Sequence, residues 1–155
     1  MDTARLVTAS FWEDETPEVL WNDRVHQRDE ALESWLAKQP ELKDHLLFAT
    51  SGTTQNPKWV ALSKRAILAS AKAVNQHLKV KNGDRWFRAL PAFHVGGIGL
   101  YARAYLSDGQ VISMKGKWNV AEFVEQLERS KSQWVSLVPT QLSDLVTHGS
   151  KAPVD

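Results

Sequence analysis

The chain has 155 residues, no cysteine and a formal net charge of +1. The lack of cysteine excludes a disulfide framework and a thiolate metal site, and the small net charge argues against a dedicated nucleic-acid binder. The sequence has no apolar run long enough to span a membrane and no signal-peptide pattern. We therefore expect a cytoplasmic protein with one hydrophobic core.

The charge is divided unevenly along the sequence. Residues 1–45 form an acidic leader, with five Lys or Arg against eleven Asp or Glu, whereas residues 46–155 carry fourteen against seven. A basic second part suits an anionic ligand, although ordinary solvated helix faces would give the same balance.

Strand-like and helix-like segments alternate along the chain. The leader holds one predicted helix over residues 29–38, ended near Pro40. The later elements, in chain order, are a strand over 46–50, a helix from Ser63 to about 78, a strand over 85–90, a helix over 97–106, a strand over 110–114, a helix over 119–130, a strand over 134–138 and a helix over 140–147. Ser63 and Asn119 are predicted N-caps, and Glu122 would complete a capping box with Asn119.

This alternation predicts an α/β fold built from βαβ units with a largely parallel sheet. We expect the leader 1–45, an α/β domain over 46–150 and a tail over 151–155. Since ligands of such sheets bind at the carboxyl ends of the strands, the segments that follow the strands are candidates for one shared site.

Residues 50–58 are the most informative segment and read Thr-Ser-Gly-Thr-Thr-Gln-Asn-Pro-Lys. Hydroxyls and loop N–H groups between a strand and a helix can donate to phosphate oxygens, and a lysine adds positive charge. The predicted phosphate-binding residues are Thr50, Ser51, Gly52, Thr53, Thr54 and Lys58. The common P-loop is excluded because Pro57, not glycine, precedes Lys58. A polar surface loop is the remaining alternative.

The segment resembles the phosphate loop of the adenylate-forming enzymes, which include acyl-CoA synthetases and luciferases. The chain departs at Gln55 and Trp59, where that family usually has glycine. Residues 90–99, Leu-Pro-Ala-Phe-His-Val-Gly-Gly-Ile-Gly, resemble a segment of the acyl-CoA ligase branch, and residues 136–142 resemble a later strand-to-helix joint. Together the segments look most like the o-succinylbenzoate–CoA ligases of menaquinone biosynthesis.

The resemblance implies an AMP-forming acid–CoA ligase that uses ATP and Mg²⁺, a small carboxylate and CoA. It also implies a substrate and CoA pocket lined by Phe93, His94, Gly96, Gly97 and Thr140. In the family, the Mg²⁺ ligands, the ribose contact and the adenylation lysine lie further along than residue 155. We therefore expect a segment of a ligase that is inactive alone, with no catalytic residue and no metal ligand of its own. The missing C-terminal part, or a second copy, is its expected partner.

Several alternatives stay open on the residues alone. His94 could be a structural residue, and the three glycines that follow it within five positions could open space for a ligand or for a close backbone. The seven tryptophans are expected to pack rather than to stack on a base, and the other four histidines are expected to face solvent. A non-catalytic phosphate-binding or interaction module of the same fold is the alternative function.

Overall fold

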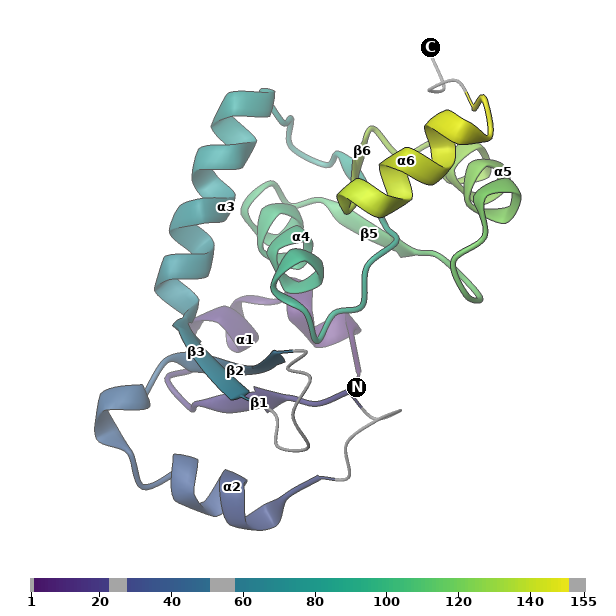
Figure 1. The fold of residues 1–155 in the computed structure, drawn as a ribbon. Coiled ribbons are helices and arrows are strands. Elements are labelled where there is room, and N and C mark those ends of the chain that lie inside the picture. Colours follow the sequence, from purple (N-terminus) through teal and green to yellow (C-terminus); the bar gives the residue numbers. More distant parts are fainter. Residues whose placement is uncertain (1, 23–27, 51–57, 151–155) are drawn as a thin grey trace.

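The computed structural model describes residues 2–22, 28–50 and 58–150, and it places their strands in two separate sheets (Figure 1). The leader sheet has the order β1-β2-β3, and the parallel sheet has the order β5-β4-β6. The strands are β1 (Glu18–Leu20), β2 (His45–Thr50), β3 (Lys58–Ser63), β4 (Arg85–Arg88), β5 (Gln110–Ser113) and β6 (Trp134–Ser136). The α-helices are α1 (Ala9–Glu13), α2 (Glu30–Leu36), α3 (Lys64–Leu78), α4 (Val95–Leu106), α5 (Val120–Ser130) and α6 (Pro139–Thr147), with 3₁₀ turns η1 (Ala4–Val7) and η2 (Pro40–Leu42).

The parallel sheet confirms the predicted α/β fold class. Both neighbours of β4 run parallel to it, and Arg88 at its carboxyl end pairs with Ser113 of β5 and Ser136 of β6. Helices α4 and α5 make the two crossovers, because parallel neighbours need a long connection. The predicted strands all exist, although β4 and β6 end two residues earlier than expected.

The leader sheet differs from the expectation of one largely parallel sheet. Strand β1, which comes from the acidic leader and was not predicted, pairs parallel with β2. Strand β3 was also not predicted; it pairs antiparallel with β2 from Thr50↔Lys58 to His45↔Ser63. The chain therefore turns back in a hairpin after β2, rather than passing from a strand through a loop into a helix.

Helix α3 begins where the sequence predicts it. The Ser63 side chain accepts a hydrogen bond from the backbone N–H of Ala66, and Lys79 in the left-handed conformation ends the helix. Ile67 and Ala71 on the predicted apolar stripe are buried. Ser63 is also the last residue of β3, so the hairpin continues into α3 without a break.

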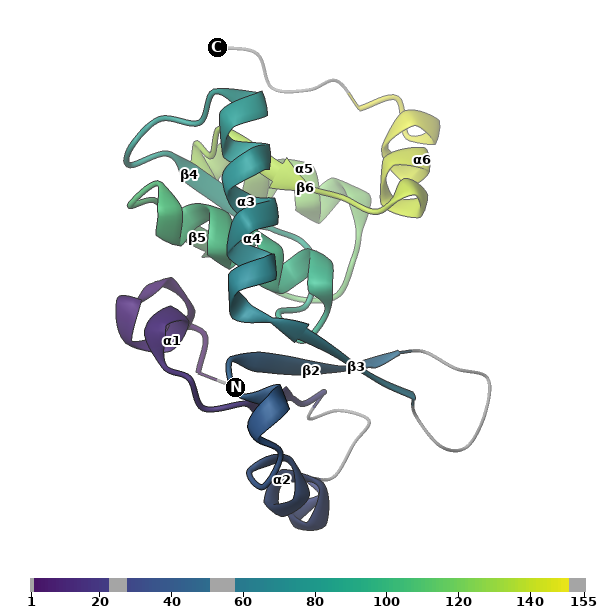
Figure 2. The same cartoon turned by 90° about the vertical axis from the view of Figure 1, so that its left-hand side faces the viewer.

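Helix α4 lies between the two halves of the core. Its sequence is apolar nearly all round, which is the pattern of a buried helix. One side of it contributes Ile98 and Tyr101 to a core shared with the leader and β2, and the other side contributes Leu100 and Ala104 to a core with Trp86. Helix α3 packs alongside it, as both views show (Figures 1 and 2).

The acidic leader contributes directly to the core. Its buried apolar residues are Leu6, Phe11, Trp12, Val19, Leu20, Trp21 and Leu36. Helix α2 confirms the predicted helix of the leader, and Asp29 caps it by accepting from the N–H groups of Ala31 and Leu32. Of its predicted apolar side, Leu36 is buried while Trp35 is 50% exposed.

Within the described residues, no helix is long and apolar enough to cross a membrane.

Candidate functional site

The two ends of the predicted phosphate loop lie side by side on β2 and β3. Thr50 ends β2, Lys58 begins β3, and the two residues pair across the strands. Residues 51–57, including the predicted binding residues Ser51, Gly52, Thr53 and Thr54, lie outside the described residues. Their role in phosphate binding stays a prediction.

The hairpin changes the physical argument for this loop. The expectation was a strand, the loop and then a helix from Ser63, whose free N–H groups could help to bind phosphate. Helix α3 does begin at Ser63–Lys64, but strand β3 lies between it and the loop, so its N-terminus is at the opposite end of β3 from Lys58. Anion binding here therefore has to rely on Lys58 and on the loop itself rather than on the dipole of α3.

Two of the three motif segments share one edge of the parallel sheet. Phe93 and His94 follow β4, and Thr140 follows β6, so both segments leave the carboxyl edge of neighbouring parallel strands. The phosphate loop follows β2, which belongs to the leader sheet. The expectation that all three segments gather at one edge of one sheet is thus wrong for the phosphate loop.

His94 is the N-cap residue of α4, and its side chain makes no capping hydrogen bond. Its imidazole lies against the Phe93 ring, with the ring centroids 4.6 Å apart. Partial burial lowers the pKa of His94 below its ordinary value, because the charged form loses hydration. Burial therefore favours the neutral imidazole at neutral pH.

Close packing explains at least one of the glycines that follow His94. A Cβ atom on Gly97 would lie only 1.8 Å from the carbonyl oxygen of Pro91, and one on Gly96 would lie 3.1 Å from Leu90 Cδ1. The first turn of α4 can approach the Pro91 backbone only without a side chain at position 97, whereas at position 96 the near atom is the end of the Leu90 side chain. Of the two alternatives left open by the sequence, the close backbone explains Gly97.

Arg103 is a candidate site residue that the sequence reasoning missed. Its Nη1 donates to Ser136 Oγ at 2.7 Å at the end of β6, and its guanidinium carbon lies 5.6 Å from the centroid of the Trp86 ring. The buried Nε has no hydrogen-bond partner, and no carboxylate pairs with this arginine among the residues that the structure describes. Burial lowers the pKa of the guanidinium, yet arginine stays charged at neutral pH.

A second arginine lies at the same carboxyl edge. Arg88 ends β4; its Nε donates to Ser113 Oγ at 3.1 Å and its Nη1 to the Leu90 carbonyl at 2.6 Å. It lines a pocket of about 330 Å³ together with Trp21, Phe93 and Trp118, and it is the only charged side chain among the described lining residues. Two cations thus lie near this edge, Arg88 at the end of β4 and Arg103 beside the end of β6.

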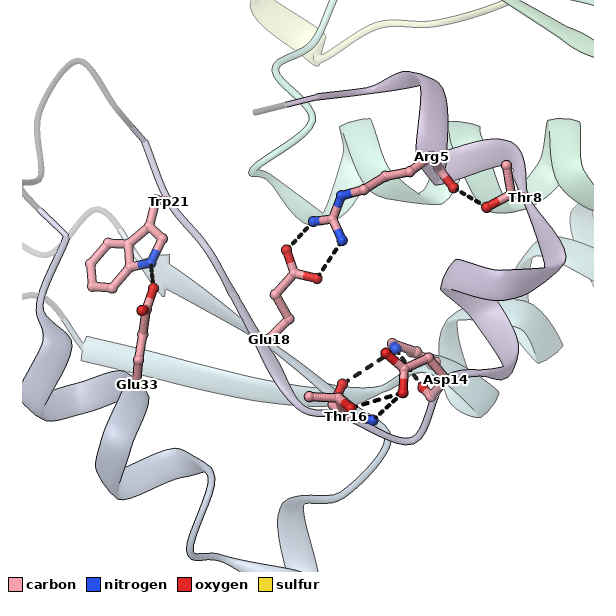
Figure 3. Close-up of polar contacts among 8 residues, drawn as sticks. Arg5, Thr8, Asp14, Thr16, Glu18, Trp21 and Glu33 are labelled. Atoms are coloured by element: carbon pink, nitrogen blue, oxygen red, sulfur yellow. Dashed lines mark hydrogen bonds and ion pairs between the residues drawn. The ribbon is translucent and has the colours of Figure 1, made fainter.

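Hydrogen bonds orient two of the aromatic rings that line this pocket. Trp21 Nε1 donates to Glu33 Oε1 at 2.6 Å, as Figure 3 shows, and Trp118 Nε1 donates to Asp144 Oδ2 at 2.8 Å. Trp59 packs edge-on against Trp21, with the ring centroids 5.2 Å apart, which fits the expected packing role. Anchored rings of this kind provide flat apolar surfaces whose positions are set before any ligand arrives.

Charged side chains brace the described part of the leader and join it to the start of α3. Arg5 faces Glu18 in a two-pronged ion pair, seen in Figure 3. Lys64, which is only 1% exposed, donates from Nζ to the carbonyl oxygen of Asp14 at 2.6 Å. The start of α3 is thereby fixed to the leader. In the described part of the chain, no group of three His, Asp or Glu side chains could hold a metal ion.

The sequence matches the AMP-binding enzyme family over residues 7–154. The chain belongs to this family. The match begins inside the acidic leader, in agreement with the packing of η1, α1 and β1 against the rest of the core.

Curated relatives within the family are acid–CoA ligases. The chain is 32% identical to the sulfoacetate–CoA ligase of Cupriavidus necator and 30% identical to the 2-succinylbenzoate–CoA ligase of Bacillus pumilus. Each match covers 67% of this chain and 21% of the relative. The chain thus spans about a fifth of the length of these relatives.

Solved structures show the same fold. The o-succinylbenzoate coenzyme A synthetase of Bacillus subtilis in complex with AMP superposes with a TM-score of 0.60 at 28% identity, covering 70% of this chain and 22% of that chain. The same enzyme in complex with ATP and a magnesium ion gives a TM-score of 0.55 at 25% identity, over 74% and 33% of the two chains. These likenesses confirm the resemblance to the adenylate-forming acid–CoA ligases.

Proposed function

We propose that this chain forms part of an AMP-forming acid–CoA ligase whose acid carries a second anionic group, with 2-succinylbenzoate as the favoured substrate. Such an enzyme adenylates a carboxylate with ATP, releases pyrophosphate and passes the acyl group to CoA. The family, the phosphate-loop motif and the ATP and Mg²⁺ complex of the Bacillus subtilis relative support this assignment.

The observation that carries the substrate class is the state of Arg103. A half-buried guanidinium without a carboxylate partner in the described residues is costly, unless an anion joins it when the site is filled. Its partner Ser136 ends β6 at the carboxyl edge, where parallel sheets bind ligands. Sulfoacetate and 2-succinylbenzoate, named in the two relatives, both keep a second anionic group after one carboxylate has been activated.

The other site residues take complementary roles in this proposal. Lys58 and the loop from Thr50 to Thr54 hold the ATP phosphates, and neutral His94 with Phe93 lies beside the acyl group and the CoA thiol. Thr140, at the start of α6, follows Ser136 beyond the carboxyl end of β6. Mg²⁺ ligands and the remaining nucleotide contacts come from the part of the enzyme that this chain does not span, and the enzyme acts in the cytoplasm.

Titration calorimetry with 2-succinylbenzoate tests the proposal on the protein as it is. Arg103→Gln should weaken binding by about 1.5–3 kcal/mol, or roughly tenfold and more, because a charged hydrogen bond is lost. Arg65→Gln removes the same charge from the exposed face of α3 and should leave affinity unchanged. Equal affinities for the parent and Arg103→Gln would refute the substrate class.

A non-catalytic phosphate-binding module is the second candidate. It is favoured by Gln55 and Trp59, which stand where the adenylate-forming enzymes usually have glycine. Under this reading the chain binds polyphosphate but shows no affinity for either acid.

A further inference from the structure

The pocket that Arg88 lines is a candidate site of its own. It has a volume of about 330 Å³ and lies where three strands end, because Trp21 directly follows β1, Arg88 ends β4 and Met114 directly follows β5. Among the described residues that the proposed function uses, only Phe93 lines it. The pocket is therefore distinct from the place where Arg103 meets the end of β6.

Arg88 is a fixed cation that keeps most of its N–H groups for a ligand. Its Nε donates to Ser113 Oγ at 3.1 Å, and its Nη1 donates to the Leu90 carbonyl oxygen at 2.6 Å. Its guanidinium carbon lies 6.0 Å from the centroid of the Tyr101 ring. Among the residues that the structure describes, Nη2 donates no hydrogen bond and no carboxylate pairs with Arg88. A guanidinium held in this way can still form a two-pronged bond with a carboxylate.

Aromatic rings form the walls of the pocket beside the guanidinium. They belong to Trp21, Phe93 and Trp118. The Trp21 indole is held by Glu33, as Figure 3 shows, and the Trp118 indole is held by Asp144. Rings that are already fixed lose little freedom when a flat ligand stacks on them. The volume is near the lower limit of small-molecule sites, which is about 300 Å³, so a ligand with a single ring suits it.

We propose that this pocket binds a small aromatic carboxylate, with its ring between the aromatic walls and its carboxylate on Arg88. One guanidinium matches the single negative charge of a carboxylate, and an aromatic acid brings the flat apolar face that the walls accept. The site joins the leader sheet to the parallel sheet, because Trp21 comes from the end of β1 and Arg88 from the end of β4. The bound acid therefore strengthens the contact between these two parts, whichever acid the ligase activates.

Nuclear magnetic resonance of the isotope-labelled chain tests the site with benzoate as the probe. The chain has seven tryptophans, and each indole gives one N–H signal. Trp21→Phe, Trp118→Phe and Trp35→Phe assign three of these signals. Benzoate should shift the signals of Trp21 and Trp118, whereas the signal of Trp35, which is 50% exposed on α2, should stay in place.

Two further probes separate the ring from the charge. Benzamide has the flat ring without the charge and should bind roughly tenfold or more weakly than benzoate, because the charged hydrogen bonds are lost. Cyclohexanecarboxylate has the charge without the flat ring and should bind several-fold more weakly than benzoate, because it cannot stack on the indoles.

Arg88→Gln should weaken benzoate binding roughly tenfold or more for the same reason as benzamide. Arg85→Gln is the matched control, since it removes the same charge from the exposed amino end of the same strand, and it should bind benzoate like the parent. Arg88→Lys keeps the charge without the planar fork and should have an affinity between those of the parent and Arg88→Gln. The dispersion of the amide signals shows whether each variant is folded.

Several results would overturn the proposal. They are unshifted Trp21 and Trp118 signals in benzoate, equal benzoate affinities for the parent and a folded Arg88→Gln, and equal affinities of the parent for benzoate and cyclohexanecarboxylate. The three probes on the parent decide the question even where Arg88→Gln does not fold. Arg103→Gln should leave benzoate binding at these two signals unchanged, and its loss would merge the pocket with the Arg103 site and so overturn the proposal. Because the proposed function rests on Arg103 and this site on Arg88, each can fail without the other.

Discussion

Replacement of Gly97 by alanine tests the packing role assigned to the glycines of the substrate segment. The added methyl carbon would lie 1.8 Å from the Pro91 carbonyl oxygen and 2.6 Å from its carbon, against the 3.4 Å at which ordinary contact begins. The backbone therefore has to move by about 1.6 Å. Overpacking of a buried backbone contact of this kind should cost about 3 kcal/mol in the free energy of unfolding.

The melting temperature follows from the size of the chain. For a protein of about 150 residues, 1 kcal/mol corresponds to roughly 2–4 °C, so Gly97→Ala should lower the melting temperature by about 6–12 °C. Gly99→Ala is the control in the same helix. The nearest atom to its new methyl group would be Arg103 Nη2 at 3.9 Å, so alanine should stabilise α4 by about 0.5–1 kcal/mol.

Urea and thermal denaturation of the three proteins distinguish the two roles of the glycines. Opposite signs for two glycine-to-alanine changes, two residues apart, are expected only if Gly97 serves a close backbone contact. A Gly97→Ala protein as stable as the parent would refute the reasoning and would return this glycine to a role in making room for a ligand.

Three further perturbations follow from described contacts. Lys64→Met should lower the free energy of unfolding, measured by urea denaturation, by about 1–3 kcal/mol, because the Asp14 carbonyl loses its buried donor. Lys72→Met on the exposed face of α3 should change it by no more than about 0.5 kcal/mol. Equal effects of the two changes would contradict the attachment of α3 to the leader. Asn119→Ala should lower the free energy of unfolding by about 1 kcal/mol, since the Asn119 side chain accepts a hydrogen bond from the Glu122 N–H. Glu122→Ala should change stability little, because the Glu122 side chain returns no hydrogen bond to Asn119. Equal losses with the two variants would show a complete capping box. The pKa of His94 is lowered in the folded state, so the unfolded state binds a proton first as the pH falls below about 6.5, and the parent protein loses stability. His94→Gln should lose less stability than the parent between pH 7 and pH 5, as measured by urea denaturation. Identical urea midpoints for the two proteins at both pH values would exclude this linkage.

Local signals in the sequence predicted most of the second half of the fold. Ser63 and Asn119 cap helices as expected, because a side-chain oxygen before an apolar-periodic run acts within one helical turn. The strands of the parallel sheet were found from apolar runs bounded by turn residues. Such signals need only a few neighbouring residues, which the chain itself provides.

Strand pairings between segments far apart in the sequence could not be predicted from such local signals. Strand β1 has three residues and pairs with β2 across α2, so no local pattern identifies it. Strand β3 follows Pro57 and leads directly into α3, and its first residue, Lys58, was interpreted as part of the phosphate loop. That interpretation placed the loop at the wrong kind of junction, although the family that its residues indicate was identified correctly.

The sequence around Arg103 contains a signal for a site residue that the prediction did not use. It is the only charged residue in the otherwise apolar sequence of α4, and a lone charge in a buried helix needs a partner. The sequence could not say which partner, because Ser136 lies 33 positions away and meets Arg103 only through the packing of α4 on the parallel sheet.

The pairing of β1 with β2 limits how far the protein can be shortened. A version trimmed to residues 46–150 would keep all three motif segments and would look complete by its likeness to the ligases. It would also expose the edge of β2 that β1 covers and remove Leu6, Trp12 and Leu20 from the core. A bare strand edge beside uncovered apolar side chains is a template for intermolecular pairing. Such a version should therefore aggregate, and the acidic leader is better regarded as the element that keeps the phosphate-loop hairpin soluble than as a dispensable extension.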